Sequence, residues 1–525
     1  MFPVLVLRGQ TGNNLGRKSS EMSIKRQTVW NMAPMMVTAV TGFISMPLFL
    51  RFLGPENYAI WGYVLAFGGM FGFADLGLGV AVGRYVSMAL GQGDQAAVRS
   101  YWGTGNAIIV PTLVLIAGCL VGFGCWLGPK WYPVGTHLIL FRYCIVAGGL
   151  ELLFAYYSQY WLILSQANLD FKFVGFLRAI MALVKVVPAI LLAYLTRNPL
   201  LMAFWFALAS LIQLIVFVRH GNKIYQLGGE FSSASMARVR EMFGYLSKNL
   251  AVMLTGSFFN NVDRNVLGRY ASAGDFSYYT MAGNPAARLQ SVSISVMGPV
   301  FYNSSRLASE DRHSAAAAVY NETFHFVFGW YLLAAVWVAT WQPVFTHFWL
   351  EHTMGAQAGA AAAVTVGPLL VALVIAACFG AIFNISTAQL GALNRMGANL
   401  GFSAAAGVFA IVGVYEGWHL GGVQGAAWGF ALSRFPYVLQ DIYTARLVGA
   451  RGWLDWKVLG SIGTQGLVAA FFALSYLVFE PTSPWLLIPG VLHGGLMAAW
   501  LLRQPLSRWS AKWGFNRLRG LCKMA

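Results

Sequence analysis

Apolar stretches of about 18 to 25 residues recur along almost the whole chain, and they limit its possible folds more than any other feature. Each stretch is long enough to cross a hydrocarbon layer of about 30 Å as an α-helix. The alternation of apolar and polar residues over segments of about ten residues, typical of a membrane β-barrel, is absent. Hydrophobic residues make up 58% of the 525 residues and charged residues 10%, which excludes a water-soluble domain. The sequence therefore predicts an all-α polytopic membrane protein.

About fourteen transmembrane helices are expected, with ends accurate to a few residues. They are placed at 28–50, 58–83, 104–127, 138–164, 173–195, 199–218, 246–269, 277–302, 321–346, 364–388, 399–416, 422–445, 458–479 and 484–502. An even number of spans puts both termini on the same side of the membrane.

The basic residues indicate which side this is, because short cytoplasmic loops collect Lys and Arg. Of the 35 Lys and Arg residues, roughly 27 fall on the side of the termini and about five on the other. The five are Arg51, Lys130, Arg142, Arg197 and Arg269. Both termini are therefore predicted to be cytoplasmic. The formal net charge of +17 reflects this topology and suits anionic lipids, and it is no argument for nucleic acid.

The longest polar break divides the chain into two similar halves. The predicted domains are a basic cytoplasmic N-terminal segment at 1–26, a six-helix bundle at 27–218, a cytoplasmic linker at 219–243, a second six-helix bundle at 244–445, and two extra helices with a basic cytoplasmic tail at 446–525. Residues 1–26 contain no signal-peptide core, and either Met1 or Met22 is the start.

The two bundles are predicted to be pseudo-symmetric. Residues 83–101 resemble residues 302–320, and residues 164–177 resemble residues 390–403. Both pairs are separated by about 220 residues, as expected for parallel repeats related by an axis along the membrane normal. A central cavity between the bundles follows. The alternative explanation is that any two polytopic segments resemble each other in composition.

Ionisable side chains inside the spans need an explanation, because exposing six of them to lipid would cost on the order of 15 to 20 kcal/mol. The six are Asp75, Glu151, Lys185, Asp263, Arg264 and Arg288. Glu151 and Lys185 lie at similar depth on neighbouring helices and are predicted to form a structural pair. Asp263 and Arg264 are about 100° apart on one helix, so Asp263 can bond a neighbouring helix while Arg264 faces inward.

Polar side chains also follow one side of the first, second, seventh and eighth predicted helices. The members that matter most are Asn31, Asp75, Asn260, Arg264, Asn284 and Arg288. The second and eighth helices are equivalent in the two bundles, and they contain Asp75 and Arg288. These stripes predict a water-accessible cavity between the bundles. Ordinary helix packing through small residues is the alternative, since Gly68 and Gly72 have the GxxxG spacing.

No motif for nucleotide hydrolysis, metal-dependent hydrolysis or a serine nucleophile is present. His347 and His352 lie at an external helix end and are predicted to be interfacial rather than metal ligands. We expect no metal, no other cofactor and no enzymatic activity.

Three segments resemble a known family. Residues 46–87, which contain ADLGLG, and residues 260–301, which begin with NNVDR, are similar to bacterial O-antigen and exopolysaccharide flippases. ALNRMG at 392–397 is a third match. These flippases belong to the multidrug/oligosaccharidyl-lipid/polysaccharide exporter superfamily. The resemblance extends over residues 27–445. It implies two six-helix bundles and two extra helices, with the first, second, seventh and eighth helices around a cavity open alternately to each side.

The resemblance also implies a function. Such flippases move an oligosaccharide, joined through pyrophosphate to undecaprenyl lipid, from the cytoplasmic to the periplasmic leaflet of the bacterial inner membrane. The product serves the synthesis of O-antigen, capsule or exopolysaccharide. The implied substrate-binding residues are Arg288, Arg264, Asn260, Asn284 and Asn31. Asp75 and Asp263 are the implied ion-coupling or gating residues, with proton or sodium coupling. A polysaccharide polymerase and a chain-length regulator are the expected protein partners.

Three other functions stay open. An ion-coupled multidrug or cation exporter of the same superfamily would need an acidic cavity, whereas the six intramembrane groups balance three against three. A flippase for the peptidoglycan lipid precursor would bind the same lipid pyrophosphate. A non-transporting subunit of a polysaccharide assembly complex would use the charges only for structure.

Overall fold

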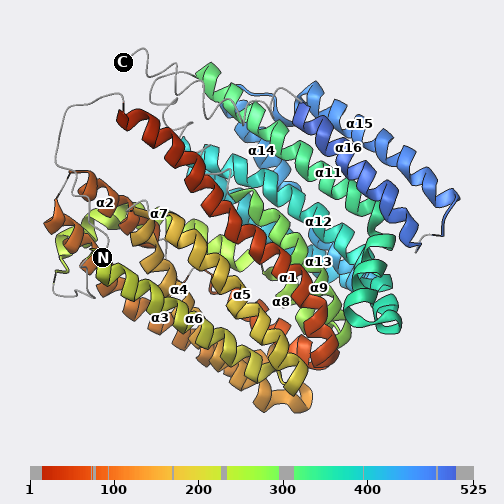
Figure 1. The fold of residues 1–525 in the computed structure, drawn as a ribbon, viewed down its shortest axis with the longest axis horizontal. Helices are drawn as coiled ribbons and strands as arrows, with labels where there is room; N and C mark the ends of the chain where they lie inside the picture. The colour runs from red at the N-terminus through yellow and green to blue at the C-terminus, as the bar shows by residue number, and fades with distance from the viewer. Residues whose placement is uncertain are drawn as a thin grey trace.

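The chain is helical throughout its described residues, which include no β-strand (Figure 1). The structure, a computed structural model, describes residues 15–503 except 73, 75–77, 93, 168–170, 226–232, 260, 295–312, 394 and 481–482. Within this part of the chain, nine helices are long and apolar enough to cross a membrane. Every predicted span contains helix, so the predicted all-α polytopic class is confirmed.

Helix α1, Leu15–Gly69, is 55 residues long and contains the first predicted span and the start of the second. It consists of two helical segments joined at Gly54, where φ is 78°. Glycine adopts this left-handed conformation without a steric penalty. Pro55 then opens the second segment, where its missing N–H costs no hydrogen bond.

The expectation of one continuous helix over 58–83 is wrong, because α1 ends at Gly69 and α2 spans Leu78–Gln92. The break lies where another part of the chain approaches the backbone closely. A Cβ atom on Gly69 would lie 2.4 Å from Oδ1 of Asn261, which leaves no room for any side chain. A hydropathy window does not detect such a contact.

Helices α1 and α2 form the N-terminal bundle with four further helices. These are α3 (Gln95–Trp131), α4 (Leu138–Ala167), α5 (Phe171–Thr196) and α6 (Pro199–Tyr225). Helix α4 packs against α3 and α6, and α1 packs against α5. Trp102 of α3 and Tyr160 of α4 stack with ring centroids 4.5 Å apart, and both are buried. Aromatic stacking of this kind fixes how the two helices sit against each other.

The C-terminal bundle contains seven described helices. These are α7 (Met236–Phe259), α8 (Val262–Tyr270), α9 (Ala273–Val292), α11 (His313–Met354), α12 (Ala356–Ala392), α13 (Met396–Leu432) and α14 (Phe435–Val448). The predicted span 246–269 is therefore not one helix, since a turn at Asn261 separates α7 from α8. Helix α12 is central, and it packs against α9, α11, α13 and α14.

Helix α13 joins two predicted spans, because it folds back at Gly421 and Gly422. Its two halves touch through glycines, and a Cβ atom on Gly429 would lie 1.8 Å from the carbonyl oxygen of Gly413. The predicted span 422–445 is then interrupted again before α14 begins. The breaks therefore do not lie where the predicted spans end.

The two extra helices lie at the outer edge of the molecule, beside α11 (Figure 1). They are α15 (Trp456–Ala473) and α16 (Leu487–Arg503). Short 3₁₀ turns join the larger helices at η1 (Gly135–His137), η2 (Gly452–Leu454), η3 (Leu474–Leu477) and η4 (Pro484–Leu486).

The bundles have two ends, which we call the kink end and the linker end. The kink end contains the bend in α1 and the turns between α3 and α4, α5 and α6, α8 and α9, and α11 and α12. The linker end contains the turns between α2 and α3, α4 and α5, α6 and α7, and α14 and α15. Arg269 and Lys130 are two of the five basic residues that we expect on the side of the membrane opposite the termini. They meet at the kink end, where Arg269 Nη1 donates to the Lys130 carbonyl at 2.6 Å.

Candidate functional site

The seam between the two bundles is the place where α1 meets α8 and α9. Arg264 of α8 donates a hydrogen bond from Nη2 to Oδ1 of Asn284 in α9, at 3.2 Å. Asn284 Nδ2 and the Tyr58 hydroxyl each lie 3.3 Å from Sδ of Met46. We call Met46, Tyr58, Arg264, Asn284 and Arg288 the seam cluster. It places the charged donor Arg264 at the boundary between the bundles, where its partner Asn284 also contacts Met46 of α1.

Arg288 lies one helical turn beyond Asn284 in α9, and its side chain is exposed. Its Nε atom lies 4.0 Å from the place that a Cβ atom would take on Gly42, so the guanidinium faces α1. In the part of the chain that the structure describes, no carboxylate pairs with Arg264 or Arg288. Each guanidinium offers five N–H donors, so the seam cluster has donors to spare for a ligand.

Asp263 points away from Arg264, although the two are neighbours in α8. It is 5% exposed, and its Oδ2 accepts a hydrogen bond of 2.8 Å from the Tyr279 hydroxyl of α9. Its Oδ1 has no hydrogen-bond partner among the described residues. The helical spacing predicts this divergence, with one side chain turned to a neighbouring helix and the other toward the seam.

The other predicted residues of the site are not all described. Asp75 and Asn260 lie outside the described residues, and only the backbone of Asn31 is described, as part of α1. The segment just before Asp75 lies between α4 and α7. The carbonyl oxygen of Gly72 accepts a hydrogen bond from Tyr156, and a Cβ atom on Gly72 would lie 3.1 Å from Ser257 Oγ.

Glu151 and Lys185 form an ion pair inside the N-terminal bundle. Nζ of Lys185 lies 3.6 Å from Oε1 of Glu151, and Ser210 Oγ lies 3.4 Å from the same oxygen. The three residues come from α4, α5 and α6. The pair therefore lies on helices that do not form the seam.

Sequence reasoning did not single out Arg178, Arg434 and Asp441, which also lie inside predicted spans. Arg178 lies in the predicted span 173–195, and the other two lie in 422–445. Reading every span for all its charges, rather than for its deepest ones, would have found them. Arg178 donates to Gln159 Oε1 at 2.8 Å within the N-terminal bundle.

Arg434 and Asp441 are buried inside the C-terminal bundle. The Arg434 guanidinium lies 4.1 Å from the ring centroid of Phe430, a cation–π contact that partly replaces a counter-ion. The Asp441 carboxylate accepts hydrogen bonds from Ser386 Oγ and from Trp453 Nε1. Both groups are thus satisfied within one bundle, and neither belongs to the seam cluster.

The kink end is closed by hydrogen bonds between the bundles. Asn265 of α8 donates from Nδ2 to the Ala66 carbonyl of α1 at 3.2 Å, and the Tyr132 hydroxyl donates to its Oδ1. Ser277 of α9 donates to the carbonyl of Pro55 at 2.7 Å. Most of these bonds end on backbone carbonyls, which fixes the backbones of the two bundles relative to each other.

Buried aromatic rings reinforce this closure. The Tyr63 ring of α1 lies between the rings of Tyr132 and Phe276, at centroid distances of 4.6 and 4.4 Å. All three rings are buried. Tyr132 belongs to the N-terminal bundle and Phe276 to the C-terminal bundle, so this stack bridges the two.

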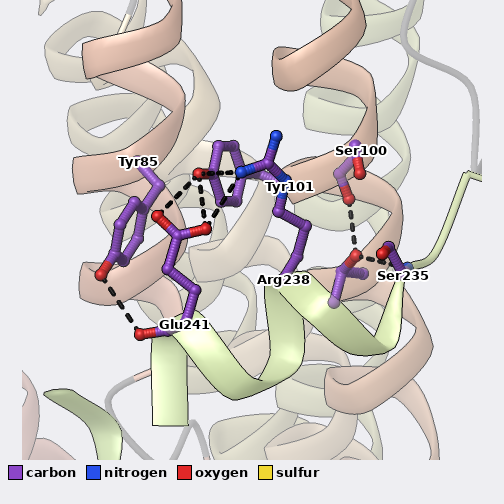
Figure 2. Close-up of polar contacts among 7 residues, drawn as sticks. Tyr85, Ser100, Tyr101, Ser235, Arg238 and Glu241 are labelled. Atoms are coloured by element: carbon purple, nitrogen blue, oxygen red, sulfur yellow. Dashed lines mark hydrogen bonds and ion pairs between the residues drawn. The ribbon is translucent and has the colours of Figure 1, made fainter. Parts of the chain in front are cut away.

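The linker end is joined by a different set of groups, shown in Figure 2. Arg238 and Glu241 of α7 contact Tyr101 of α3 and Tyr85 of α2. The bundles therefore touch at both ends, and the seam cluster lies between the two contacts. Among the described residues, no group of three or more His, Cys, Asp or Glu side chains could hold a metal ion. The arrangement can bind an anion between two helical bundles.

Comparison with known proteins places this arrangement in context. The sequence profile of a family described as "Polysaccharide biosynthesis protein" matches residues 24–303, which is more than half of the chain. No curated protein matches the sequence.

Several solved structures share the fold. Lipid II flippase MurJ in an inward closed conformation has a TM-score of 0.68 and 14% identity, and the match covers 91% of this chain and 99% of that one. A multidrug resistance MATE family transporter of the MOP superfamily, inward-facing, has a TM-score of 0.62 and 12% identity, over 81% and 98%. A variant of the Vibrio cholerae MATE transporter VcmN has a TM-score of 0.56 and 15% identity, over 84% and 99%. At such identities the likeness concerns the fold.

Proposed function

Because the chain belongs to the polysaccharide biosynthesis protein family and has the fold of a membrane flippase or exporter, we propose that it flips a lipid-linked oligosaccharide. The substrate is an undecaprenyl-pyrophosphate-linked repeat unit, moved from the cytoplasmic to the periplasmic leaflet of the bacterial inner membrane by alternating access. The product supplies the synthesis of O-antigen, capsule or exopolysaccharide. The observation that supports this most directly is the pair of guanidinium groups, Arg264 and Arg288, with no carboxylate partner among the described residues.

Pyrophosphate suits the seam cluster chemically. A planar guanidinium donates paired hydrogen bonds to phosphate oxygens, and such contacts are stronger where bulk water is excluded. Asn284 holds Arg264 in place, whereas the exposed Arg288 is available to a ligand. Arg264 therefore acts as the preorganised half of the site and Arg288 as the mobile half. Asn31 and Asn260 complete the proposed set and bind through their amide groups.

The direction of transport follows from charge. A cytoplasm-negative potential favours outward movement of an anion by about 2.3 kcal/mol per charge per 100 mV. Asp75 and Asp263 are proposed to gate the path or to couple it to a proton or sodium ion. Oδ1 of Asp263 has no hydrogen-bond partner in the described part of the chain, which fits a group that takes up a small cation for part of the cycle.

We assign the linker end to the cytoplasm. Roughly 27 of the 35 basic residues fall on that side, which fits an anionic cytoplasmic leaflet. Both termini are then cytoplasmic. A polysaccharide polymerase and a chain-length regulator are the proposed partners, since they would act on the flipped product.

One rival has direct support in the comparisons. Lipid II flippase MurJ shares the fold, and a peptidoglycan precursor would present the same lipid pyrophosphate to Arg264 and Arg288. A cation exporter fits less well, because the carboxylate next to Arg264 turns away from the seam toward Tyr279.

The test is to delete the gene in its host and measure lipid-linked oligosaccharide in each leaflet. The deletion strain is complemented at matched abundance with wild type, Arg288→Ala, Arg264→Ala and a control, Arg142→Ala. Arg142 is an exposed arginine of α4 that lies outside the seam. We expect the intermediate to accumulate on the cytoplasmic leaflet, and wild type and Arg142→Ala to restore its export. Arg288→Ala and Arg264→Ala should restore it at least tenfold less well.

Three outcomes contradict the proposal. Unchanged lipid intermediates and unchanged surface polysaccharide in the deletion strain would exclude the flippase. Accumulation of peptidoglycan precursor in place of oligosaccharide would favour the rival substrate, and altered drug sensitivity alone would favour an exporter.

A further inference from the structure

A small cluster of polar side chains joins the bundles at the linker end (Figure 2). Tyr85 comes from the middle of α2 and Tyr101 from the start of α3, both in the N-terminal bundle. Arg238 and Glu241 come from the first turns of α7, where the C-terminal bundle begins. We call these four residues the latch.

The hydrogen bonds of the latch form a closed circuit. The Tyr101 hydroxyl donates to Oε2 of Glu241 at 2.9 Å and accepts from Nη1 of Arg238 at 2.7 Å. The same Nη1 lies 3.0 Å from Glu241 Oε2. Arg238 also covers the Tyr101 ring, with Cζ 4.4 Å from the centroid. The hydroxyl of Tyr101 thus mediates between a cation and an anion of the other bundle.

Tyr85 adds a weaker contact from a second helix. Its hydroxyl lies 3.4 Å from the carbonyl oxygen of Glu241, and its ring stacks on Tyr101 at 5.1 Å. Just before α7, the backbone N–H of Ser235 donates to Thr104 Oγ1 at 3.0 Å. The start of α7 is therefore held against both α2 and α3.

The exposure of the latch sets it apart from a structural core. The side chains of Arg238 and Glu241 are 35% and 43% exposed. Half-exposed charged groups contribute little to stability through their contacts, and water can replace Tyr101 as the partner of Arg238 and Glu241 when α7 moves away. A contact of this kind can break and re-form in every transport cycle, whereas a buried ion pair would resist separation.

We propose that the latch holds the linker end shut when no substrate is bound and opens to admit substrate between the bundles. This inference rests on the proposed alternating access of the protein. It differs from the substrate site, because the latch residues contact each other rather than the seam cluster. Substrate entry then requires α7 to separate from α2 and α3.

The test measures distances across the linker end by dipolar electron paramagnetic resonance. The protein is reconstituted in lipid nanodiscs with its five cysteines replaced. Spin labels on exposed sites form two pairs, Gln95 with Arg240 and Gln95 with Arg446. The first pair reports on α3 and the start of α7, and the second on α3 and α14. Together they show whether only α7 moves or the whole bundle.

Latch variants are compared with a matched control. Glu241→Ala removes the anion, and Tyr101→Phe removes the hydroxyl while keeping the ring under Arg238. The control, Tyr157→Phe, removes a hydroxyl that bonds Asn106 within the N-terminal bundle. We expect both latch variants to raise the population of long distances in both pairs, about fivefold for Glu241→Ala, as expected for the loss of one hydrogen bond between the bundles. The control should match wild type.

Two results would overturn the latch. Unchanged distributions in both variants would mean that the contact does not bias the equilibrium. Lengthening of the first pair alone would mean that the contact only anchors α7. The spin-label distances are measured without substrate, so the test of the latch does not depend on the test of transport. If the latch variants show longer distances but the protein flips no glycolipid, the latch is supported and the proposed function is contradicted.

Discussion

The kink end joins the bundles mainly through buried groups, with exposed hydrogen bonds from Arg51 and Arg269 at its edge, whereas the linker end joins them through the half-exposed Arg238 and Glu241. At the kink end, Tyr63 and Phe276 are 1% and 0% exposed, and hydrogen bonds run to backbone carbonyls. At the linker end, Arg238 and Glu241 of α7 contact Tyr101 of α3 through flexible, half-exposed side chains. A buried contact is costly to separate, while a half-exposed charged group exchanges its partner for water at small cost. The proposed opening of the linker end should therefore cost less than opening of the kink end.

In the proposed transport cycle, this difference would let a single seam serve both sides of the membrane. The seam cluster lies between a strong closure and a weak one. A bound anion that draws Arg264 and Arg288 toward itself changes the spacing of α1, α8 and α9, which also form the kink end. Substrate binding can thus favour release of the strong closure, while the weak one closes behind it.

The largest effect is expected from removing the aromatic bridge at the kink end. Tyr63→Ala leaves a cavity between Tyr132 and Phe276, and it should destabilise the protein by about 3 to 5 kcal/mol. It should also shift the molecule toward an opening at the kink end. Thermal unfolding in detergent and spin-label distances across that end measure the two effects. Phe141→Ala is the control, since Phe141 is buried and packs on Tyr132 within one bundle. Equal opening in both variants would mean that the bridge has no special role.

A smaller effect is expected from the buried amide of the same end. Asn265→Ala leaves the Tyr132 hydroxyl and the Ala66 carbonyl without their partner, at a cost of about 1 to 3 kcal/mol. The expected result is a kink end that opens more often, with little change at the linker end. Cysteine accessibility at the two ends distinguishes these outcomes. A variant that loosens both ends equally would contradict the separation of the two closures.

The sequence predicts the helices well because the length of an apolar stretch decides whether it can cross a bilayer. It fails at the breaks after Gly69, at Asn261 and before Arg434. The breaks after Gly69 and before Arg434 lie inside apolar segments, where a hydropathy window averages over the interruption, whereas the polar residues around Asn261 were assigned to a stripe on one continuous helix. The close contact between Gly413 and Gly429 is a tertiary contact, and no local sequence pattern predicts it.

The site could be predicted from the sequence only where the spacing along a helix determines the direction in which a side chain points. The 100° step between Asp263 and Arg264 predicts their divergence, and the period of α9 aligns Asn284 with Arg288. Met46 and Tyr58 were not predicted, because an apolar thioether and a tyrosine give no signal of their own. Arg238 and Glu241 lie outside every predicted span. From the sequence they are therefore only charged residues of a cytoplasmic linker, with no predicted partner.

Salt should act mainly on the linker end. Raising the ionic strength from about 0.1 to 1 M shortens the Debye length from about 10 to 3 Å, which weakens the ion pair within α7 that orients Arg238 and Glu241 toward Tyr101. We expect wild type to shift toward the distance distribution of Glu241→Ala at high salt, a change of about 0.5 kcal/mol. Distances at the kink end should change less, because its closure rests mainly on buried rings and on hydrogen bonds to backbone carbonyls. A shift of equal size at both ends would contradict the comparison.

The smallest effect is expected from Tyr85→Phe. The hydroxyl of Tyr85 lies 3.4 Å from the Glu241 carbonyl, which is long for a hydrogen bond, and its loss should change the equilibrium by less than about 0.5 kcal/mol. The ring remains and keeps its stacking with Tyr101. Combining Tyr85→Phe with Tyr101→Phe measures whether the two hydroxyls act together. If their effects add, the latch is a sum of independent contacts. If the double variant equals Tyr101→Phe alone, the Tyr85 hydroxyl depends on the circuit through Glu241, and the closure of the linker end is cooperative.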